Sequence, residues 1–136
     1  MVAQALVIDD EKAILNILRT LLVKQSFKVK VAHDGREGIE LFDNGHDFDL
    51  VITDIRMPRV NGNQVAKHIR GSDKSDTPIV AMSGYTKEID KSLFNFSVTK
   101  PFRLETLINV IKIFKRCPKT KLIEPARWVG GFRYHA

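Results

Sequence analysis

The sequence is poor in the features that mark secreted and membrane proteins. Its 136 residues contain one cysteine, Cys117, and a single cysteine can form neither an internal disulfide nor a cysteine-based zinc site. No apolar run approaches the roughly 20 residues that a membrane-spanning helix needs. The amino-terminal stretch MVAQALVIDDEK has no basic segment before its short apolar run, so we expect no signal peptide. These absences favour a cytoplasmic protein without a membrane span.

Excess basic charge is also absent from most of the chain, although the formal net charge is +6. Residues 1–114 hold 16 Lys and Arg against 15 Asp and Glu, whereas residues 115–136 hold six against one. The excess therefore belongs to the tail, and a basic groove across the fold is not supported. Although the tail carries aromatic residues among its basic ones, it has no room for a helix-turn-helix. We expect no specific DNA binding.

Short apolar runs alternate with helical patterns along the chain. The pattern predicts strands at 5–8, 28–32, 50–54, 79–82 and 96–99, and helices at 11–24, 36–44, 64–70 and 104–114. Strands separated by helices imply right-handed crossovers and a parallel sheet covered on both faces. We therefore expect an α/β protein, a three-layer α/β/α sandwich spanning residues 1–117. Residues 118–136 form a basic C-terminal extension that is too short to be a separate domain.

Polar side chains stand where four of these strands end. Asp9 and Asp10 follow the first strand, Asp54 ends the third, Ser83 follows the fourth and Lys100 follows the fifth. In a parallel α/β sheet these strand ends share one edge, where ligands usually bind. Three carboxylates crowded together repel one another, and a hard cation such as Mg²⁺ relieves the conflict. A phosphoryl group there would give the carboxylates, the lysine and the hydroxyl distinct roles.

Taken singly, each of these residues has an ordinary explanation. An Asp-Asp pair after a strand more often caps a helix or lies in a solvated turn, and Ser83 is equally suited to capping the next helix. Asp54 alone suits a turn, and Lys100 alone suits a solvated surface position. A single site is favoured because all five residues are expected at the same edge of the sheet.

The same residues resemble a known family. Asp9-Asp10, Asp54 in ITDIRMP, Ser83 in VAMSG and Lys100-Pro101-Phe102 are similar to the motifs of the receiver domain of two-component response regulators. The resemblance covers about residues 3–117. It implies a five-stranded parallel sheet of flavodoxin-like order 2-1-3-4-5 and a Lys100–Pro101 peptide bond in the cis form.

The resemblance also implies the chemistry. A histidine kinase or histidine phosphotransfer domain would phosphorylate Asp54, and Ser83 would be the switch hydroxyl and Lys100 the phosphoryl contact. Mg²⁺ (or Mn²⁺) would be held by Asp9, Asp10, Asp54 and the backbone carbonyl of Arg56. Such a protein is a phosphoprotein that assists its own phosphorylation and dephosphorylation without being an enzyme. Its output is a switchable contact with a downstream protein that the sequence does not name.

Two alternatives stay open at this point. The resemblance favours a stand-alone bacterial receiver first, and the runner-up is the receiver fragment of a larger DNA-binding response regulator or of a hybrid histidine kinase. A Mg²⁺-dependent phosphatase with an aspartyl nucleophile is a weaker candidate, because such enzymes use a second acid two residues after the nucleophile. That position is Arg56 here.

The output region departs from the family pattern. The position three residues before Lys100, usually aromatic, is Ser97, and Phe96 beside it is expected to point to the opposite face of the strand. The switch position is Ser83 where threonine is commoner. Only 17 positions separate Ser83 from Lys100, so the helix between them should be short.

Two long side chains also flank the expected acceptor. Arg56 and Tyr85 stand two residues after Asp54 and Ser83, at positions that vary in the family. We expect them to cover the phosphoryl group, impede the attacking water and so lengthen the lifetime of the phosphorylated form.

Overall fold

A computed structural model describes residues 2–116, 126–129 and 132–135. Its centre is a five-stranded parallel sheet of order β2-β1-β3-β4-β5. The strands are β1 (Gln4–Ile8), β2 (Lys28–Ala32), β3 (Leu50–Asp54), β4 (Ile79–Ser83) and β5 (Phe96–Thr99), and the helices are α1 (Lys12–Lys24), α2 (Gly35–Asp43), α3 (Gly62–Arg70) and α4 (Leu104–Arg116). The expected fold class and strand order are confirmed.

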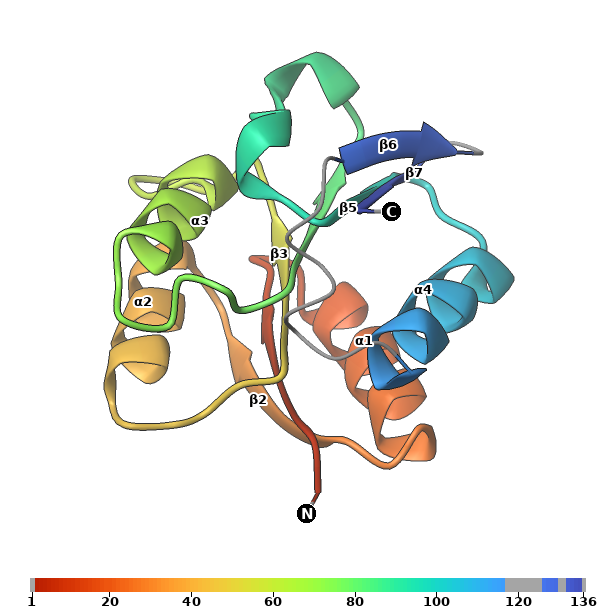
Figure 1. The fold of residues 1–136 in the computed structure, drawn as a ribbon, viewed down its shortest axis with the longest axis horizontal. Coiled ribbons are helices and arrows are strands. Elements are labelled where there is room, and N and C mark those ends of the chain that lie inside the picture. Colours follow the sequence, from red (N-terminus) through yellow and green to blue (C-terminus); the bar gives the residue numbers. More distant parts are fainter. Residues whose placement is uncertain (1, 117–125, 130–131, 136) are drawn as a thin grey trace.

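The helices form a layer on each side of the sheet: α1 and α4 cover one face, and α2 and α3 cover the other (Figure 1). Alternation along the strands supplies both cores, because successive side chains point to opposite faces. In β1, Ala5 and Val7 join the core under α1 and α4, whereas Leu6 and Ile8 join the core under α2 and α3. Strands covered on both faces read as continuous apolar runs, and this is why β1, β3 and β4 were recognisable from the sequence.

The connection between β4 and β5 differs from the short helix that the spacing predicts. Within it lie two single 3₁₀ turns, η1 (Thr86–Glu88) and η2 (Lys91–Leu93), and no α-helix. Side chains of α3 hold this segment. Asn63 donates to the Glu88 carbonyl (2.6 Å) and accepts from the Asp90 N–H (2.9 Å). The connection holds too few residues for a stable α-helix, because helix formation is cooperative and needs several turns. Single 3₁₀ turns bound to α3 form instead.

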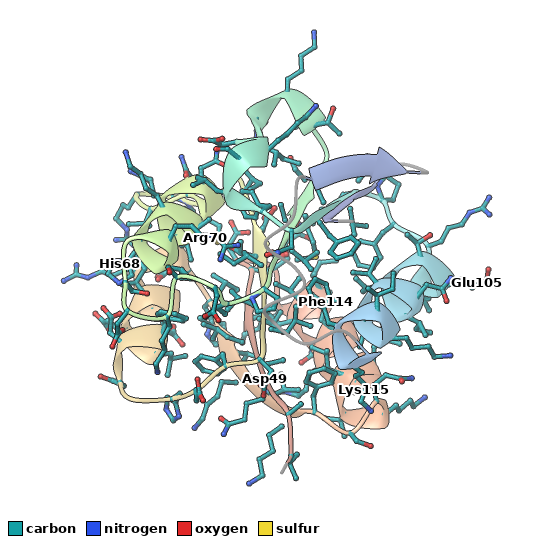
Figure 2. The ribbon with its side chains drawn as sticks, viewed as in Figure 1. Asp49, His68, Arg70, Glu105, Phe114 and Lys115 are labelled. Atoms are coloured by element: carbon teal, nitrogen blue, oxygen red, sulfur yellow. The ribbon has the colours of Figure 1, made fainter. Side chains whose placement is uncertain are left out.

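Arg70, at the end of α3, fastens the far end of the same connection (Figure 2). Its guanidinium donates to the Leu93 carbonyl (3.0 Å) and to the Asn95 side chain (2.8 Å). Another of its nitrogens donates to the Thr77 carbonyl (2.6 Å). Burial lowers the pKa of Arg70 to about 10, so the group stays charged at neutral pH and satisfies these carbonyls.

Part of the C-terminal extension is described. Strands β6 (Ala126–Val129) and β7 (Phe132–His135) pair in antiparallel fashion, and β7 lies next to β5 (Figure 1). Cys117 and the rest of the extension lie outside the described residues, and its status as no separate domain stays a prediction. Among the helices of the described ranges, none has the length and apolar character that a membrane crossing requires.

Candidate functional site

Three aspartates meet where β1 and β3 end. Asp9 and Asp10 follow β1, and Asp54 is the last residue of β3. One carboxylate oxygen from each lies within 4.8 Å of the others. Asp9 and Asp54 are buried, whereas Asp10 is exposed at the rim. The structure therefore brings together the three carboxylates that the sequence placed at one sheet edge.

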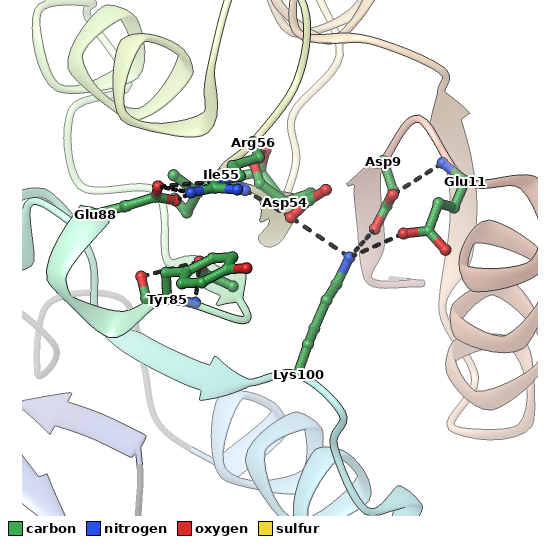
Figure 3. Close-up of polar contacts among 10 residues, drawn as sticks. Asp9, Glu11, Asp54, Ile55, Arg56, Tyr85, Glu88 and Lys100 are labelled. Atoms are coloured by element: carbon green, nitrogen blue, oxygen red, sulfur yellow. Dashed lines mark hydrogen bonds and ion pairs between the residues drawn. The ribbon is translucent and has the colours of Figure 1, made fainter.

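Lys100, which follows β5, reaches into this cluster (Figure 3). Its Nζ lies 3.0 Å from Asp9 Oδ2, 3.4 Å from Asp54 Oδ1 and 3.9 Å from Glu11 Oε1. Burial opposes the charge of the ammonium, but the hydrogen bond and charge of Asp9, with the charges of Asp54 and Glu11, raise the pKa of Lys100. Glu11 was missed by the sequence analysis, and its only signal there was its place directly after the acid pair.

The cluster still carries more negative charge than Lys100 neutralises. Burial, together with the neighbouring charge of Asp9, raises the pKa of Asp54 to about 6, against the opposing effects of Lys100 and the Ile55 N–H. Burial also raises the pKa of Asp9, against the opposing effects of the Glu11 N–H and Lys100. Removal from water disfavours the charged form of carboxylates, and a nearby cation favours it. Their oxygen atoms are the ligands that Mg²⁺ prefers, so the residues present fit such an ion.

The loop after β3 closes tightly around Asp54. The Ile55 N–H donates to Asp54 Oδ1 (2.9 Å), and the Gly62 N–H donates to the Ile55 carbonyl (2.9 Å). A Cβ atom at Gly62 would collide with the Asp54 carbonyl oxygen and approach Ile55 Cα to 2.9 Å. Asn61 and Gln64 form a capping box that starts α3 at Gly62, two residues before the expected start. Gly62 thus permits a backbone approach that holds the aspartate in place, which a turn signal alone does not reveal.

Ser83 ends β4 beside this cluster, and its hydroxyl is engaged locally. The Oγ accepts from the Tyr85 N–H (3.0 Å) and donates to the Tyr85 carbonyl (3.1 Å). The Ser83 carbonyl accepts from the Lys100 N–H (2.8 Å), which fixes the two strand ends together. The hydroxyl therefore holds the backbone that leads into η1 without capping it, because the cap residue is Tyr85 and no side chain caps this turn. Its role as the switch hydroxyl stays a prediction.

Arg56 and Tyr85, the two long residues flanking the site, contact each other. The Arg56 guanidinium lies over the Tyr85 ring at 4.0 Å from its centroid. It also pairs with Glu88, with Nη2 2.6 Å and Nε 2.8 Å from Oε1 (Figure 3). The hydrogen bond that Arg56 donates to Glu88 raises the pKa of Arg56. A surface pocket of about 640 Å³ adjoins the pair and is lined by Ile55, Arg56, Met57, Pro58, Asn61, Asn63 and Glu88.

On β5, Phe96 and Ser97 point to opposite faces, as the strand alternation predicts. Phe96 packs edge-on against Phe114 of α4 with ring centroids 4.8 Å apart, and β5 pairs with β4 without a register slip. Ser97 is only 1% exposed, and its Oγ has no hydrogen-bond partner in the described part of the chain. The Lys100–Pro101 bond is cis, as the resemblance implies.

The fold and this site define a class of protein: a doubly wound parallel α/β domain with acidic residues and a lysine at its strand ends. A family model for the response regulator receiver domain matches residues 5–112. The chain belongs to this family, whose members are signalling modules of two-component systems and bind Mg²⁺ in an acidic pocket.

Solved receiver structures superpose well on the chain. The chemotaxis response regulator CheY4 of Vibrio cholerae is 27% identical with a TM-score of 0.76, over 84% of this chain and 99% of that one. The Francisella response regulator 1452 receiver domain is 30% identical with a TM-score of 0.74, over 84% and 98%. TrrA of Thermotoga maritima, solved in complex with Mg²⁺ and BeF, is also 30% identical with a TM-score of 0.74, over 82% and 98%.

A longer relative extends beyond the receiver domain. The uncharacterized transcriptional regulatory protein YcbL of Bacillus subtilis (strain 168) is 33% identical over 127 residues. The match covers 89% of this chain but 55% of the relative, so the chain spans about half the length of that protein.

Proposed function

We propose that Asp54 accepts a phosphoryl group from a histidine kinase or a histidine phosphotransfer protein. The observation that carries this proposal is the buried Asp54 carboxylate with Lys100 Nζ 3.4 Å away and two further aspartates beside it. With a pKa of about 6 the carboxylate is ionised at neutral pH and can act as a nucleophile. One of its oxygens attacks phosphorus, and the bond from phosphorus to the histidine nitrogen breaks with its electron pair leaving on nitrogen.

Lys100 and Ser83 complete the acceptor. The Lys100 ammonium, already 3.0 Å from Asp9, supplies positive charge where negative charge develops on the phosphoryl oxygens. The Ser83 hydroxyl leaves the backbone of Tyr85 and donates to one of these oxygens. Asp54 stays oriented through the Ile55 N–H during the transfer.

The same edge of the sheet would hold Mg²⁺, or Mn²⁺, through Asp9, Asp10, Asp54 and the backbone carbonyl of Arg56. When bound, the ion adds positive charge beside the phosphoryl oxygens. The three carboxylates, whose oxygen atoms lie within 4.8 Å of one another, support this assignment, because Lys100 alone does not balance their charges.

The domain acts as a phosphorylation-controlled interaction module and not as an enzyme on an external substrate. It comprises residues 1–117, with residues 118–136 as an extension, and its output is a contact with a downstream protein. A second candidate is the receiver part of a larger DNA-binding regulator, favoured by a relative of which this chain covers 55%. A DNA-binding domain encoded in frame beyond residue 136 would support that candidate, and a stop codon there would exclude it.

Intact mass measurement tests the acceptor. The protein is incubated with acetyl phosphate and Mg²⁺, and we expect the mass of one phosphoryl group to be added in the parent and in Asp73→Asn. Asp73 is an exposed aspartate outside the site and serves as the matched control. Asp54→Asn, or the parent in EDTA, should gain none. A labelled Asp54→Asn variant would refute the assignment of the acceptor, and full labelling in EDTA would refute the metal requirement.

A further inference from the structure

Arg56 links the proposed acceptor to the connection between β4 and β5. It lies two residues after Asp54, and its guanidinium holds the carboxylate of Glu88 in η1 through both Nε and Nη2. The Tyr85 ring lies against the same guanidinium. In Figure 3 this group extends from Asp54 on the side away from Lys100. One side chain thus connects the acceptor loop with the first turn of the segment that replaces a helix.

An aromatic relay along β5 is not available in this protein. Ser97 has no ring to move, and it is buried where a ring would need space. The neighbouring ring of Phe96 packs against Phe114 on the opposite face of the sheet. A signal from Asp54 must therefore reach the surface through other contacts, and the Arg56–Glu88 pair is a direct polar connection between the two loops.

We propose that Arg56 is a charge-operated latch that binds Glu88 in the unphosphorylated protein and turns to the phosphoryl group once Asp54 carries one. This inference rests on the function proposed above. A phosphoryl group carries about −1.5 to −2 charges and three acceptor oxygens, and a guanidinium prefers such a bidentate partner. The side chains of Arg56 and Glu88 are 62% and 33% exposed. Exposed ion pairs contribute little to stability, so the exchange of partners is inexpensive.

When Arg56 leaves Glu88, a defined part of the surface can change. Glu88 keeps its backbone bond to Asn63, so the change is confined to the Glu88 side chain and to the loop from Tyr85 to Asp90. Ser83 acts on the same loop, because its hydroxyl holds both backbone groups of Tyr85. The pocket that Arg56 and Glu88 line then carries an unpaired carboxylate. Arg56 is a positioning residue in this scheme and takes no part in the transfer.

Amide chemical shifts measured with and without Mg²⁺ and beryllofluoride, a phosphoryl mimic, test the latch. In the parent we expect shifts beside Asp54, Ser83 and Lys100, together with shifts at Lys87–Asp90. In Arg56→Gln the first group should persist while the shifts at Lys87–Asp90 are largely lost, and Arg56→Lys, which keeps the charge, should restore part of them. Glu88→Gln should move the Lys87–Asp90 resonances toward their beryllofluoride positions before the mimic is added.

Arg36→Gln is the matched control, because it breaks an exposed pair with Glu40 on α2, away from the site. It should respond as the parent does. Beryllofluoride shifts at Lys87–Asp90 that are unchanged in Arg56→Gln would overturn the latch while leaving the proposed acceptor intact. An absence of bound beryllofluoride, seen by fluorine resonance in the parent, would overturn both.

Discussion

Lys100 Nζ lies 3.0 Å from Asp9 Oδ2, although the two residues are 91 positions apart in the sequence. The contact spans the sheet edge, from the end of β5 to the end of β1, and Asp54 lies between them within 3.4 Å of the same nitrogen. The ammonium thus offsets part of the repulsion among buried carboxylates. The negative charge that Lys100 does not balance determines how the site responds to pH and to cations.

The stability of the protein should depend on the ionisation of Asp54. Its pKa in the folded state is about 6, above the ordinary value of 3.8, so the stability that its proton confers is full below about pH 4 and is lost as pH rises through 6. Asp54→Asn removes this loss. At pH 8 the variant should exceed the parent by about 1–3 kcal/mol, with the difference shrinking as pH falls toward 4. Urea denaturation at several pH values measures this.

Asp73→Asn is the control for this effect, because it removes an exposed carboxylate outside the site. Its difference from the parent should not depend on pH between 4 and 8. If Asp54→Asn is no more stable than the parent at pH 8, or differs from it equally at all pH values, the raised pKa of Asp54 is wrong.

Mg²⁺ should stabilise the folded protein, because it neutralises the excess negative charge of Asp9, Asp10 and Asp54. A cation that binds the folded state alone adds about 2.7 kcal/mol when present at 100 times its dissociation constant. Thermal unfolding with increasing Mg²⁺ measures the rise in Tm, which EDTA should reverse. The rise should be largely lost in Asp9→Asn and kept in Asp73→Asn. Equal rises in both variants would place the cation elsewhere.

Replacement of Ser97 should reveal the cost of its unsatisfied hydroxyl. The Oγ is buried without a hydrogen-bond partner in the described part of the chain, and such a group costs about 1–3 kcal/mol. Ser97→Ala should therefore raise the free energy of unfolding by about 1 kcal/mol. Ser97→Tyr, which restores the aromatic of the family pattern, should lower it by about 1–3 kcal/mol because the site is filled. Urea denaturation measures both free energies of unfolding. If neither variant differs from the parent, the surroundings of residue 97 accommodate either side chain and the prediction is wrong.

Gly62→Ala should disturb the acceptor. The added methyl group would collide with the Asp54 carbonyl oxygen and press on Ile55 Cα, so the β3 loop must shift at a cost of about 1–3 kcal/mol. Phosphorylation by acetyl phosphate should slow as Asp54 moves. Gly71→Ala is the matched control, because the nearest atom to its methyl group would be the Lys67 carbonyl at an ordinary 3.5 Å. Equal phosphorylation rates in the two variants would contradict a positioning role for Gly62.

The expected lifetime effect of Arg56 and Tyr85 stays a prediction, with its geometry now defined. The Arg56 side chain contacts both the Tyr85 ring and the Glu88 carboxylate in this structure. If Arg56 turns to the phosphoryl group, the double variant Arg56→Ala with Tyr85→Ala should lose that group faster than the parent, because water then reaches phosphorus more freely. A dephosphorylation time course measures this, and an equal or slower loss would contradict it.

The sequence by itself determined the five strands of the parallel sheet, the sheet edge and the motif residues. Strands such as β3 are buried on both faces, so most of their positions are apolar, and the charged residue that ends the run marks where the strand leaves the core. Asp9, Asp54 and Lys100 were recognisable because each stands at such an end. This information is local: each strand end can be recognised without knowing which other strands lie beside it.

Tertiary structure alone decided which loops face one another across that edge. Glu11 beside Lys100, Arg56 on Glu88 and the close approach of Gly62 to Asp54 all depend on the relative positions of strand ends. The 3₁₀ turns after β4 are held by hydrogen bonds that Asn63 and Arg70 donate to the Glu88 and Leu93 carbonyls. No periodicity encodes these contacts, because each joins two groups whose separation in sequence is unrelated to their distance in the fold.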